Sequence, residues 1–206
     1  MAQVLTKPPT PTHQTAVAPS LGAQIADPAP LGLAAFALTT FMLSTFNAGL
    51  LPKSAEVAIL GVALFYGGLT QLFAGMWEFV KGNTFGALAF SSYGAFWMSL
   101  WYLFVHSGLT KADSAKGVGI FLLAWTIFTV YMTVVTARIS GLLFALFSIL
   151  LVTFVVLTIG AFASAPTITY IGGYLGLVTA FVAWYASFAG VLNITAKHIV
   201  LPTWPR

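Results

Sequence analysis

The hydrophobic residues of this chain run in long segments, each bounded by charged or turn-forming residues. A helix needs about 20 apolar residues to cross the hydrocarbon core of a bilayer. Backbone groups in lipid must be hydrogen-bonded within their own segment, so each segment is predicted to be helical. Charges fall at the segment ends only if the chain is divided into six spans. The predicted spans are about 30–51, 56–80, 84–106, 115–135, 139–161 and 170–195.

The connections between these spans are too short to hold a separate soluble domain. Pro52-Lys53 follows the first span, Lys81-Gly82-Asn83 the second and Arg138 the fourth. The sequence therefore predicts one transport domain over residues 30–201, folded as an all-α, six-transmembrane-helix bundle.

Both ends of the chain differ from the spans. Residues 1–29 are rich in Pro, Thr and Ala, which favours a mostly disordered tail. A regulatory or partner-binding tail is the alternative. Residues 202–206 form a short C-terminal tail. An even number of spans places both termini on one side, and Lys and Arg are more numerous there, so we expect cytoplasmic termini and a multi-pass protein of the cell membrane.

Composition supports a lipid-facing surface, because 59% of residues are hydrophobic and only 6% are charged. Soluble domains carry about 25% charged residues. The eight Lys and Arg are too dispersed for nucleic-acid binding. Without cysteine there is no thiolate metal site and no cysteine nucleophile. Histidines lie in the tail or near span ends, and no buried base is available, so we expect neither cofactor, metal nor enzymatic activity.

Polar and small residues follow one face of several spans. Gly68, Gln71, Gly75 and Glu78 share a face of the second span at three- and four-residue spacing. Such a stripe either lines a passage or allows close helix packing. The first span carries Thr39, Thr40 and Asn47, which lie on or beside a similar stripe. The fourth has a hydroxyl face, which is either a polar seam or the wall of a pathway: Thr126, Thr129, Thr133 and Thr136.

No charged residue lies at the centre of a span, so the inner surface is neutral and polar. Such a wall suits small solutes. A carboxylate could cross it either hydrated or, at the narrowest point, as the neutral acid, because an unpaired charge in an apolar medium is costly. Glu78 and His106 are candidate proton handlers; the alternative is that they are solvated helix ends. Tyr93 and Phe96, in mid-span, either plug a narrow passage or fill space.

Several ordered strings of residues resemble the acetate uptake transporter family. The string Asp27-Pro28-Ala29-Pro30-Leu31-Gly32-Leu33 is similar to its signature, which begins with Asn. Further matches are Phe65-Tyr66-Gly67-Gly68 with Gln71 and Glu78, Gly82-Asn83-Thr84-Phe85-Gly86, and Ser92-Tyr93-Gly94 with Phe96-Trp97. The resemblance runs from residue 27 to about residue 201.

This resemblance implies uptake of acetate, and in some members of succinate, by proton coupling or by anion passage. It implies a hexamer in which each protomer has its own pathway, and a hydrophobic constriction at Phe36, Tyr93 and Leu150. The polar residues expected to line the pathway or bind substrate are Thr39, Thr40, Asn47, Gln71 and Glu78, to which the hydroxyl face of the fourth span adds Thr129.

The signature departs from the family pattern at its first residue, Asp27. An ionised Asp only accepts hydrogen bonds, whereas Asn also donates. Asp27 either caps the first helix, which we favour, or faces the anion at the inner mouth, where it would repel it.

Two other functional classes fit the same composition. One is a channel for small neutral solutes such as ammonia or urea, and the other is a membrane scaffold whose stripes only pack helices. For an oligomer, Gly172 and Gly176 form a small-residue pair that is a candidate contact between protomers.

Overall fold

The computed structural model describes residues 21–106, 108 and 110–206. This part of the chain is helical, and six of its helical stretches are long and apolar enough to cross a membrane. The six-helix fold class and the multi-pass membrane character predicted from the sequence are therefore confirmed. In chain order the elements are α1 (Leu21–Gln24), α2 (Ala29–Asn47), the 3-10 helix η1 (Lys53–Ala58), α3 (Ile59–Val62), the π-helical η2 (Ala63–Thr70), α4 (Gln71–Lys81), α5 (Thr84–His106), α6 (Lys111–Thr136), α7 (Gly141–Ala163) and α8 (Pro166–Ala196).

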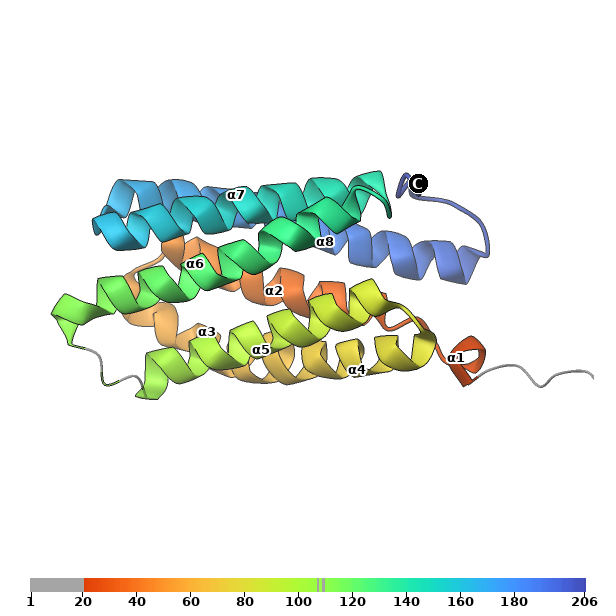
Figure 1. The fold of residues 1–206 in the computed structure, drawn as a ribbon, viewed down its shortest axis with the longest axis horizontal. Coiled ribbons are helices and arrows are strands. Elements are labelled where there is room, and N and C mark those ends of the chain that lie inside the picture. Colours follow the sequence, from red (N-terminus) through yellow and green to blue (C-terminus); the bar gives the residue numbers. More distant parts are fainter. Residues whose placement is uncertain (1–20, 107, 109) are drawn as a thin grey trace, which may run out of the picture.

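The long helices lie side by side along the long axis of the molecule (Figure 1). Helix α2 packs chiefly on α8, α4 packs on α5, and α7 packs between α6 and α8. At one end lie the connections after α2, α5 and α7, and we name it the Lys53 end. At the other lie α1, the turns after α4 and α6, and the C-terminus, and we name it the Asp27 end.

Helix ends follow local sequence signals. Helix α4 stops at Gly82, which adopts a left-handed backbone with φ of 80°, a conformation that glycine takes without steric cost. Helix α7 starts at Ser140, whose hydroxyl accepts a hydrogen bond from the Leu143 N–H at 3.1 Å. Thr110 accepts one from the Asp113 N–H at 3.2 Å in the same way. These caps satisfy N–H groups that the first turn of a helix leaves unpaired.

The second span is not a single α-helix. It begins in a 3-10 turn, continues as α3, widens into the π-helical η2 and ends as α4. Glycines of η2 lie directly against neighbouring helices: a Cβ on Gly67 would lie 2.6 Å from Thr39 Oγ1, and one on Gly68 would lie 2.7 Å from Met98 Cγ. The glycine pair therefore serves close packing, and periodicity alone gave no sign of the π-helical widening.

Several helix bounds differ from the predicted spans. Helix α2 already ends at Asn47, α6 begins at Lys111, and α8 begins at Pro166. Proline fits the first turn of a helix, where its missing N–H has no partner to lose. The prediction stopped spans at polar residues, but polar residues at helix ends lie outside the hydrocarbon and continue the helix.

The two predicted tails have different outcomes. Residues 1–20 of the predicted 1–29 tail lie outside the described residues, whereas Leu21–Gln24 form one helical turn. At the other end, residues after 201 fold back on the turn between α6 and α7. The Gly141 N–H donates to the Trp204 carbonyl at 2.7 Å, and the Arg206 N–H donates to the Ile139 carbonyl at 3.0 Å. This contact holds the C-terminal residues against the bundle.

Candidate functional site

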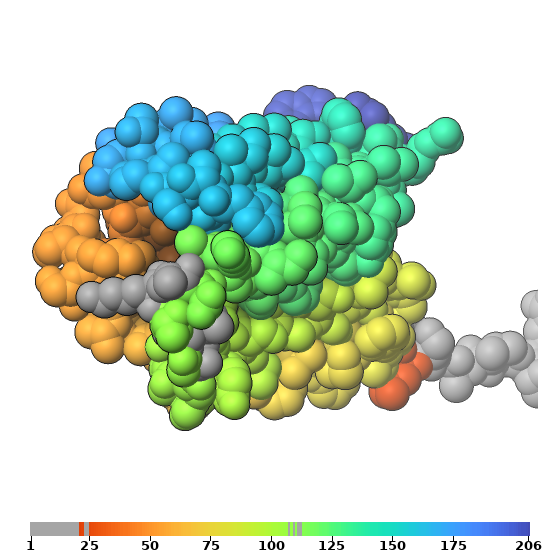
Figure 2. Space-filling view, turned by 60° about the vertical axis from the view of Figure 1, so that its left-hand side comes forward, coloured from red at the N-terminus to blue at the C-terminus, as the bar shows by residue number. Residues whose placement is uncertain are grey.

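Two cavities of unequal size lie inside the bundle. The larger has a volume of about 750 Å³ and reaches the Lys53 end, where its lining includes Lys53, Glu56 and Tyr170. Figure 2 brings this end forward and shows a recess between the orange region around η1 and the blue region where α7 meets α8. The smaller cavity, of about 90 Å³, lies toward the Asp27 end and is lined by Asn83, Gly86 and several apolar residues.

Among the described residues, Phe36 and Leu150 alone line both cavities. Tyr93 lines the smaller one, and its ring centroid lies 5.7 Å from that of Phe36. All three side chains are buried. The structure thus brings together, at the boundary between the cavities, the three residues that the family resemblance assigned to a constriction.

The Tyr93 ring is enclosed by aromatic side chains, and its hydroxyl is held from α6. Phe128 and Phe147 lie with their ring centroids 5.2 and 6.1 Å from that of Tyr93. Tyr93 Oη lies 2.9 Å from Thr129 Oγ1, and Thr129 in turn donates to the Trp125 carbonyl at 2.8 Å. Thr129 lines neither cavity, so it contacts the candidate passage only through Tyr93.

The larger cavity presents unpaired hydrogen-bonding groups near the boundary. Thr40 and Trp97 line it, and neither Thr40 Oγ1 nor Trp97 Nε1 has a hydrogen-bond partner among the described residues. Buried threonines elsewhere, such as Thr39 and Thr179, donate to the carbonyl four residues earlier. Asn47 lines the same cavity nearer its mouth. Unpaired buried polar groups cost free energy, which a bound polar solute would recover.

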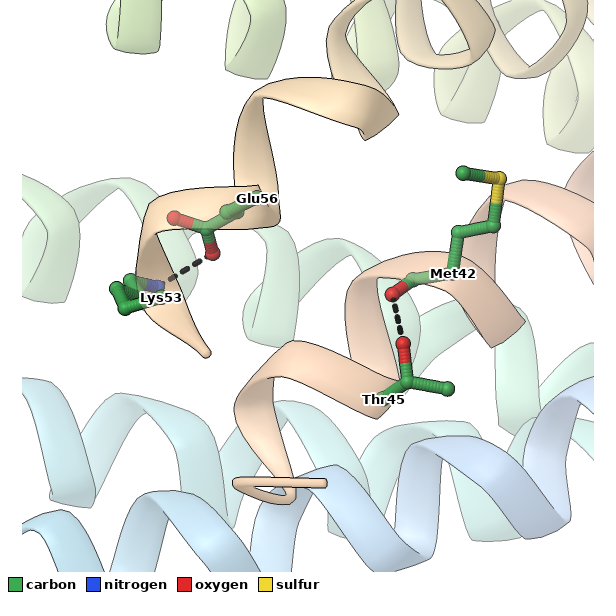
Figure 3. Close-up of polar contacts among 4 residues, drawn as sticks. All are labelled: Met42, Thr45, Lys53 and Glu56. Atoms are coloured by element: carbon green, nitrogen blue, oxygen red, sulfur yellow. Dashed lines mark hydrogen bonds and ion pairs between the residues drawn. The ribbon is translucent and has the colours of Figure 1, made fainter. Parts of the chain in front are cut away.

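The mouth of the larger cavity carries an ion pair. Lys53 donates to Glu56 within η1 (Figure 3). The Lys53 side chain is 70% exposed, whereas that of Glu56 is 15% exposed. Figure 3 also shows Thr45, near the end of α2, donating to the Met42 carbonyl at 2.7 Å. Lys53 and Glu56 are the charged residues in the described cavity lining, and both lie at its rim.

A buried carboxyl group adjoins the smaller cavity. Glu78 is fully buried, and neither carboxyl oxygen has a hydrogen-bond partner among the described residues. A Cβ added at Gly86 would lie 2.7 Å from the Glu78 carboxyl carbon and 2.6 Å from Asn83 Nδ2. Both side chains therefore lie directly against Gly86. Gln71 and Asn83 line the cavity, whereas Glu78 itself lies behind Gly86. His106, the other candidate proton handler, is exposed at the Lys53 end and stacks on Tyr102.

The remaining predicted polar residues lie away from the cavities. Thr39 is fully buried in the contact between α2 and η2 and lines neither cavity. On α6, Thr126 pairs with Thr158 of α7 at 3.2 Å, and Thr133 donates to the Phe147 carbonyl at 3.2 Å. Of the two readings of the hydroxyl face, these contacts favour the polar seam. Gly172 and Gly176 are buried against Leu157 and Ser44 within the subunit, so they are not available as a contact between protomers.

The signature segment 27–33 packs along the Asp27 end. Asp27 forms an ion pair with Lys81 at 3.0 Å and accepts the Ala29 N–H at 3.2 Å. The N-cap residue of α2 is Pro28, so Asp27 acts one residue earlier than a capping role requires. Within the rest of the segment, Ala29 and Leu33 line the smaller cavity. The Pro30 carbonyl accepts a hydrogen bond from the Ser187 hydroxyl at 2.7 Å. Gly32 lies against the Phe90 ring, and Leu31 is exposed.

Sequence reasoning missed several residues of this site. Lys53 was read only as a span boundary, and Trp97 only as part of a family string. Phe147, which packs on Tyr93, was not singled out at all, because a phenylalanine in an apolar span carries no distinguishing signal. Lys53 and Glu56 are two opposite charges three residues apart in a short connection. This pattern is the signal that could have identified the mouth of the larger cavity.

Comparison with known proteins gives consistent matches. Residues 10–205 match the model of the GPR1/FUN34/yaaH family. The chain is 40% identical over 197 residues to Ammonia transport outward protein 2 of Saccharomyces cerevisiae, covering 92% of this chain and 70% of that protein. It is 39% identical over 181 residues to the succinate-acetate/proton symporter SatP of Escherichia coli, covering 87% and 95%.

A solved structure, that of the bacterial acetate channel SatP, superimposes with a TM-score of 0.81 at 40% identity. The match covers 87% of this chain and 99% of that one. The sequence and structural matches both extend over most of the bundle, including the two cavities and the residues between them. This chain is a member of the GPR1/FUN34/yaaH family.

Proposed function

We propose that this chain transports acetate, and with lower preference succinate, across the membrane through the two cavities and past Phe36, Tyr93 and Leu150. The observation that carries the proposal is that the two cavities meet at residues lining both of them. The names of two relatives, a succinate-acetate/proton symporter and an acetate channel, support the same substrate class. Transport, rather than catalysis, is the activity for which this geometry is suited.

The polar groups fit a small carboxylate in the larger cavity. The Thr40 hydroxyl and the Trp97 indole N–H are both donors that lack partners, and a carboxylate is a strong acceptor. Lys53 at the mouth is paired with Glu56, so the rim has a donor for a carboxylate but the pair carries no net charge. Asn47 lies along the way and can donate through its amide.

Beyond the boundary the passage becomes narrow and apolar, so the substrate must shed most of its water there. We propose that a proton accompanies the carboxylate at this step. Glu78, buried beside the smaller cavity, is the candidate proton carrier on the Asp27 side. A carboxyl group at this position can take up a proton from the substrate and release it again.

The proposal extends to assembly of identical protomers into a hexamer, each with its own passage, as the family resemblance implies. Helix α4 has exposed aromatic side chains, Phe73, Trp77 and Phe79, which can pack on lipid or on a neighbouring protomer. Light scattering of the protein in several mild detergents tests this extension, and a monomer in all of them contradicts it.

Ammonia transport is the second candidate, because a relative in Saccharomyces cerevisiae is named for it. An uncharged, partly apolar passage also suits ammonia. The unpaired donors of Thr40 and Trp97 favour the carboxylate, because its two charged oxygens can accept from both donors at once, whereas ammonia has one lone pair.

The deciding experiment measures flux in liposomes that contain the purified protein. Uptake of labelled acetate is compared with uptake of labelled succinate and urea, and ammonia entry is followed by an internal pH dye. We expect acetate uptake well above that of empty liposomes, and weaker succinate uptake. Flux of ammonia or urea without acetate flux contradicts the proposal and favours the alternative.

A further inference from the structure

The hydroxyl of Tyr93 belongs to a short chain of buried hydrogen-bonding groups. Tyr93 Oη lies 2.9 Å from Thr129 Oγ1, which lies 2.8 Å from the Trp125 carbonyl oxygen. The Tyr93 side chain is 2% exposed and that of Thr129 is fully buried. The three groups form a chain that runs from the edge of the smaller cavity into α6.

Counting protons fixes the direction of this chain. Each hydroxyl has one proton to donate, and a carbonyl oxygen can only accept. The contact with Trp125 therefore uses the proton of Thr129, so the contact between the two hydroxyls uses the proton of Tyr93. Either hydroxyl could donate in the contact between them, but the reverse direction would leave the Tyr93 proton without an acceptor among the described residues, and a buried donor without an acceptor is costly.

The Tyr93 proton consequently points to α6 and away from the cavity that Tyr93 lines. Phe36 and Leu150 have no polar side-chain atoms, so the side chains of the three constriction residues offer no N–H or O–H to a passing solute. A carboxylate would lose its water donors there without replacement. The undissociated acid carries no charge, and its own O–H can donate to the free lone pair of Tyr93 Oη.

We propose that Thr129 is a positioning residue that turns the Tyr93 hydroxyl proton out of the passage and thereby makes the constriction selective for the undissociated acid over its anion. The inference rests on the proposed function and specifies the chemical form that crosses. On this inference, the preference for the acid over its anion depends on the direction of one hydrogen bond and needs no charged residue in the constriction.

The charged and titratable groups around Tyr93 are consistent with this assignment. Apart from Tyr93 itself, the described residues that line the smaller cavity include no ionisable side chain. The Glu78 carboxyl lies behind Gly86, and Tyr131 of α6 reaches the cluster only through its contact with Phe128. Helices α2 and α7 face Tyr93 with Phe36 and Phe147.

The test is Thr129→Val, which removes the acceptor and nearly keeps the side-chain volume. The Tyr93 proton then has no protein acceptor and is free to donate to a carboxylate. Labelled acetate flux and electrical current are measured in liposomes under a clamped membrane potential, at about pH 5 and at about pH 7.5, where nearly all of a carboxylic acid is ionised. We expect a several-fold gain in flux and in current at the higher pH and little change at the lower pH.

Three further variants separate positioning from a merely structural role. Thr129→Ser keeps the hydroxyl and should keep the wild-type pH profile. Tyr93→Phe has no hydroxyl proton and should keep its preference for the acid. The double variant Thr129→Val with Tyr93→Phe should lose the gain that Thr129→Val shows alone. Size-exclusion elution and thermal unfolding in detergent report whether each variant folds.

Several outcomes overturn the inference. Equal losses of flux at both pH values in folded Thr129→Val indicate a structural role only. A fall in flux and current at about pH 7.5 in folded Tyr93→Phe shows that the wild-type hydroxyl donates to the anion, and this result stands even if Thr129→Val does not fold. Absence of acetate flux in the wild-type protein at both pH values instead rejects the proposed function, and the inference with it.

Discussion

The cavities on the two sides of Phe36 and Leu150 differ in size and in wall chemistry. The cavity at the Lys53 end measures about 750 Å³, and its wall holds the unpaired donors of Thr40 and Trp97. The cavity at the Asp27 end measures about 90 Å³, and the hydroxyl of the tyrosine in its wall is hydrogen-bonded to Thr129 of α6. Acetate can enter the first cavity with its hydration water, whereas the second has room only for a nearly dehydrated solute.

This contrast shows how a passage without a fixed charge at its centre can still discriminate between solutes. The wide side admits carboxylates with their hydration water and has hydrogen-bond donors among its lining residues. On our proposal the narrow side then selects by dehydration, because its volume leaves little room for water and most of its lining is apolar. Entry and selection are therefore assigned to different residues, and substitutions on the two sides should have different effects.

The largest expected effect comes from filling the narrow side. Ala89→Leu places extra carbon atoms in the wall of the smaller cavity, which has little room, and should lower acetate flux in liposomes by more than about tenfold. Ala161→Leu, the matched control, adds the same atoms to the wall of the larger cavity and should change flux by less than about twofold. Equal losses of acetate flux in both variants would contradict the proposed difference between the narrow and the wide cavity.

Widening the boundary should have the next largest effect. Phe36→Ala removes a ring that both cavities share, so the longer succinate should pass more easily. We expect the ratio of succinate to acetate uptake to rise several-fold, on the scale of the about 1–3 kcal/mol by which a pocket discriminates size. Phe73→Ala, on the exposed face of α4, is the control and should leave the ratio unchanged.

Removing a donor on the wide side should weaken binding without blocking passage. Trp97→Phe deletes the unpaired indole N–H and keeps an aromatic ring in the wall. One lost hydrogen bond of about 1 kcal/mol corresponds to a several-fold rise in the acetate concentration that half-saturates uptake. Trp77→Phe, which is exposed on α4, serves as the control. An unchanged half-saturating concentration would show that Trp97 does not contact the substrate.

The smallest effect is expected at the Asp27 end. Asp27→Asn keeps an oxygen that can accept the Ala29 N–H and loses the ion pair with Lys81, in which both side chains are 31% exposed. Partly exposed ion pairs contribute at most about 1 kcal/mol, so the midpoint of thermal unfolding should fall slightly and acetate uptake should stay near normal. A large gain in uptake would indicate that the carboxylate repels the substrate at this mouth.

A site residue could be predicted from the sequence when its type is rare in membrane-spanning segments. Polar residues are rare in spans, so Thr40, Asn47, Gln71 and Glu78 could be identified from the sequence as candidates. The same reasoning also selected Thr39, which packs against Gly67, because helical periodicity gives a face but does not say which neighbour covers it. Tyr93 could be singled out by its mid-span position, but its assignment with Phe36 and Leu150 to one constriction came from the family resemblance, since apolar residues are common in every span.

The sequence by itself determined the membrane location and the six helical spans, because the hydrocarbon core dictates both the length of an apolar segment and its helical hydrogen bonding. Only the tertiary structure decided which faces meet, where two cavities remain, and which two hydroxyls lie within hydrogen-bonding distance. Those features depend on distances between α2, α5, α6 and α7, which are set by side-chain packing across the bundle and leave no periodic signal along the chain.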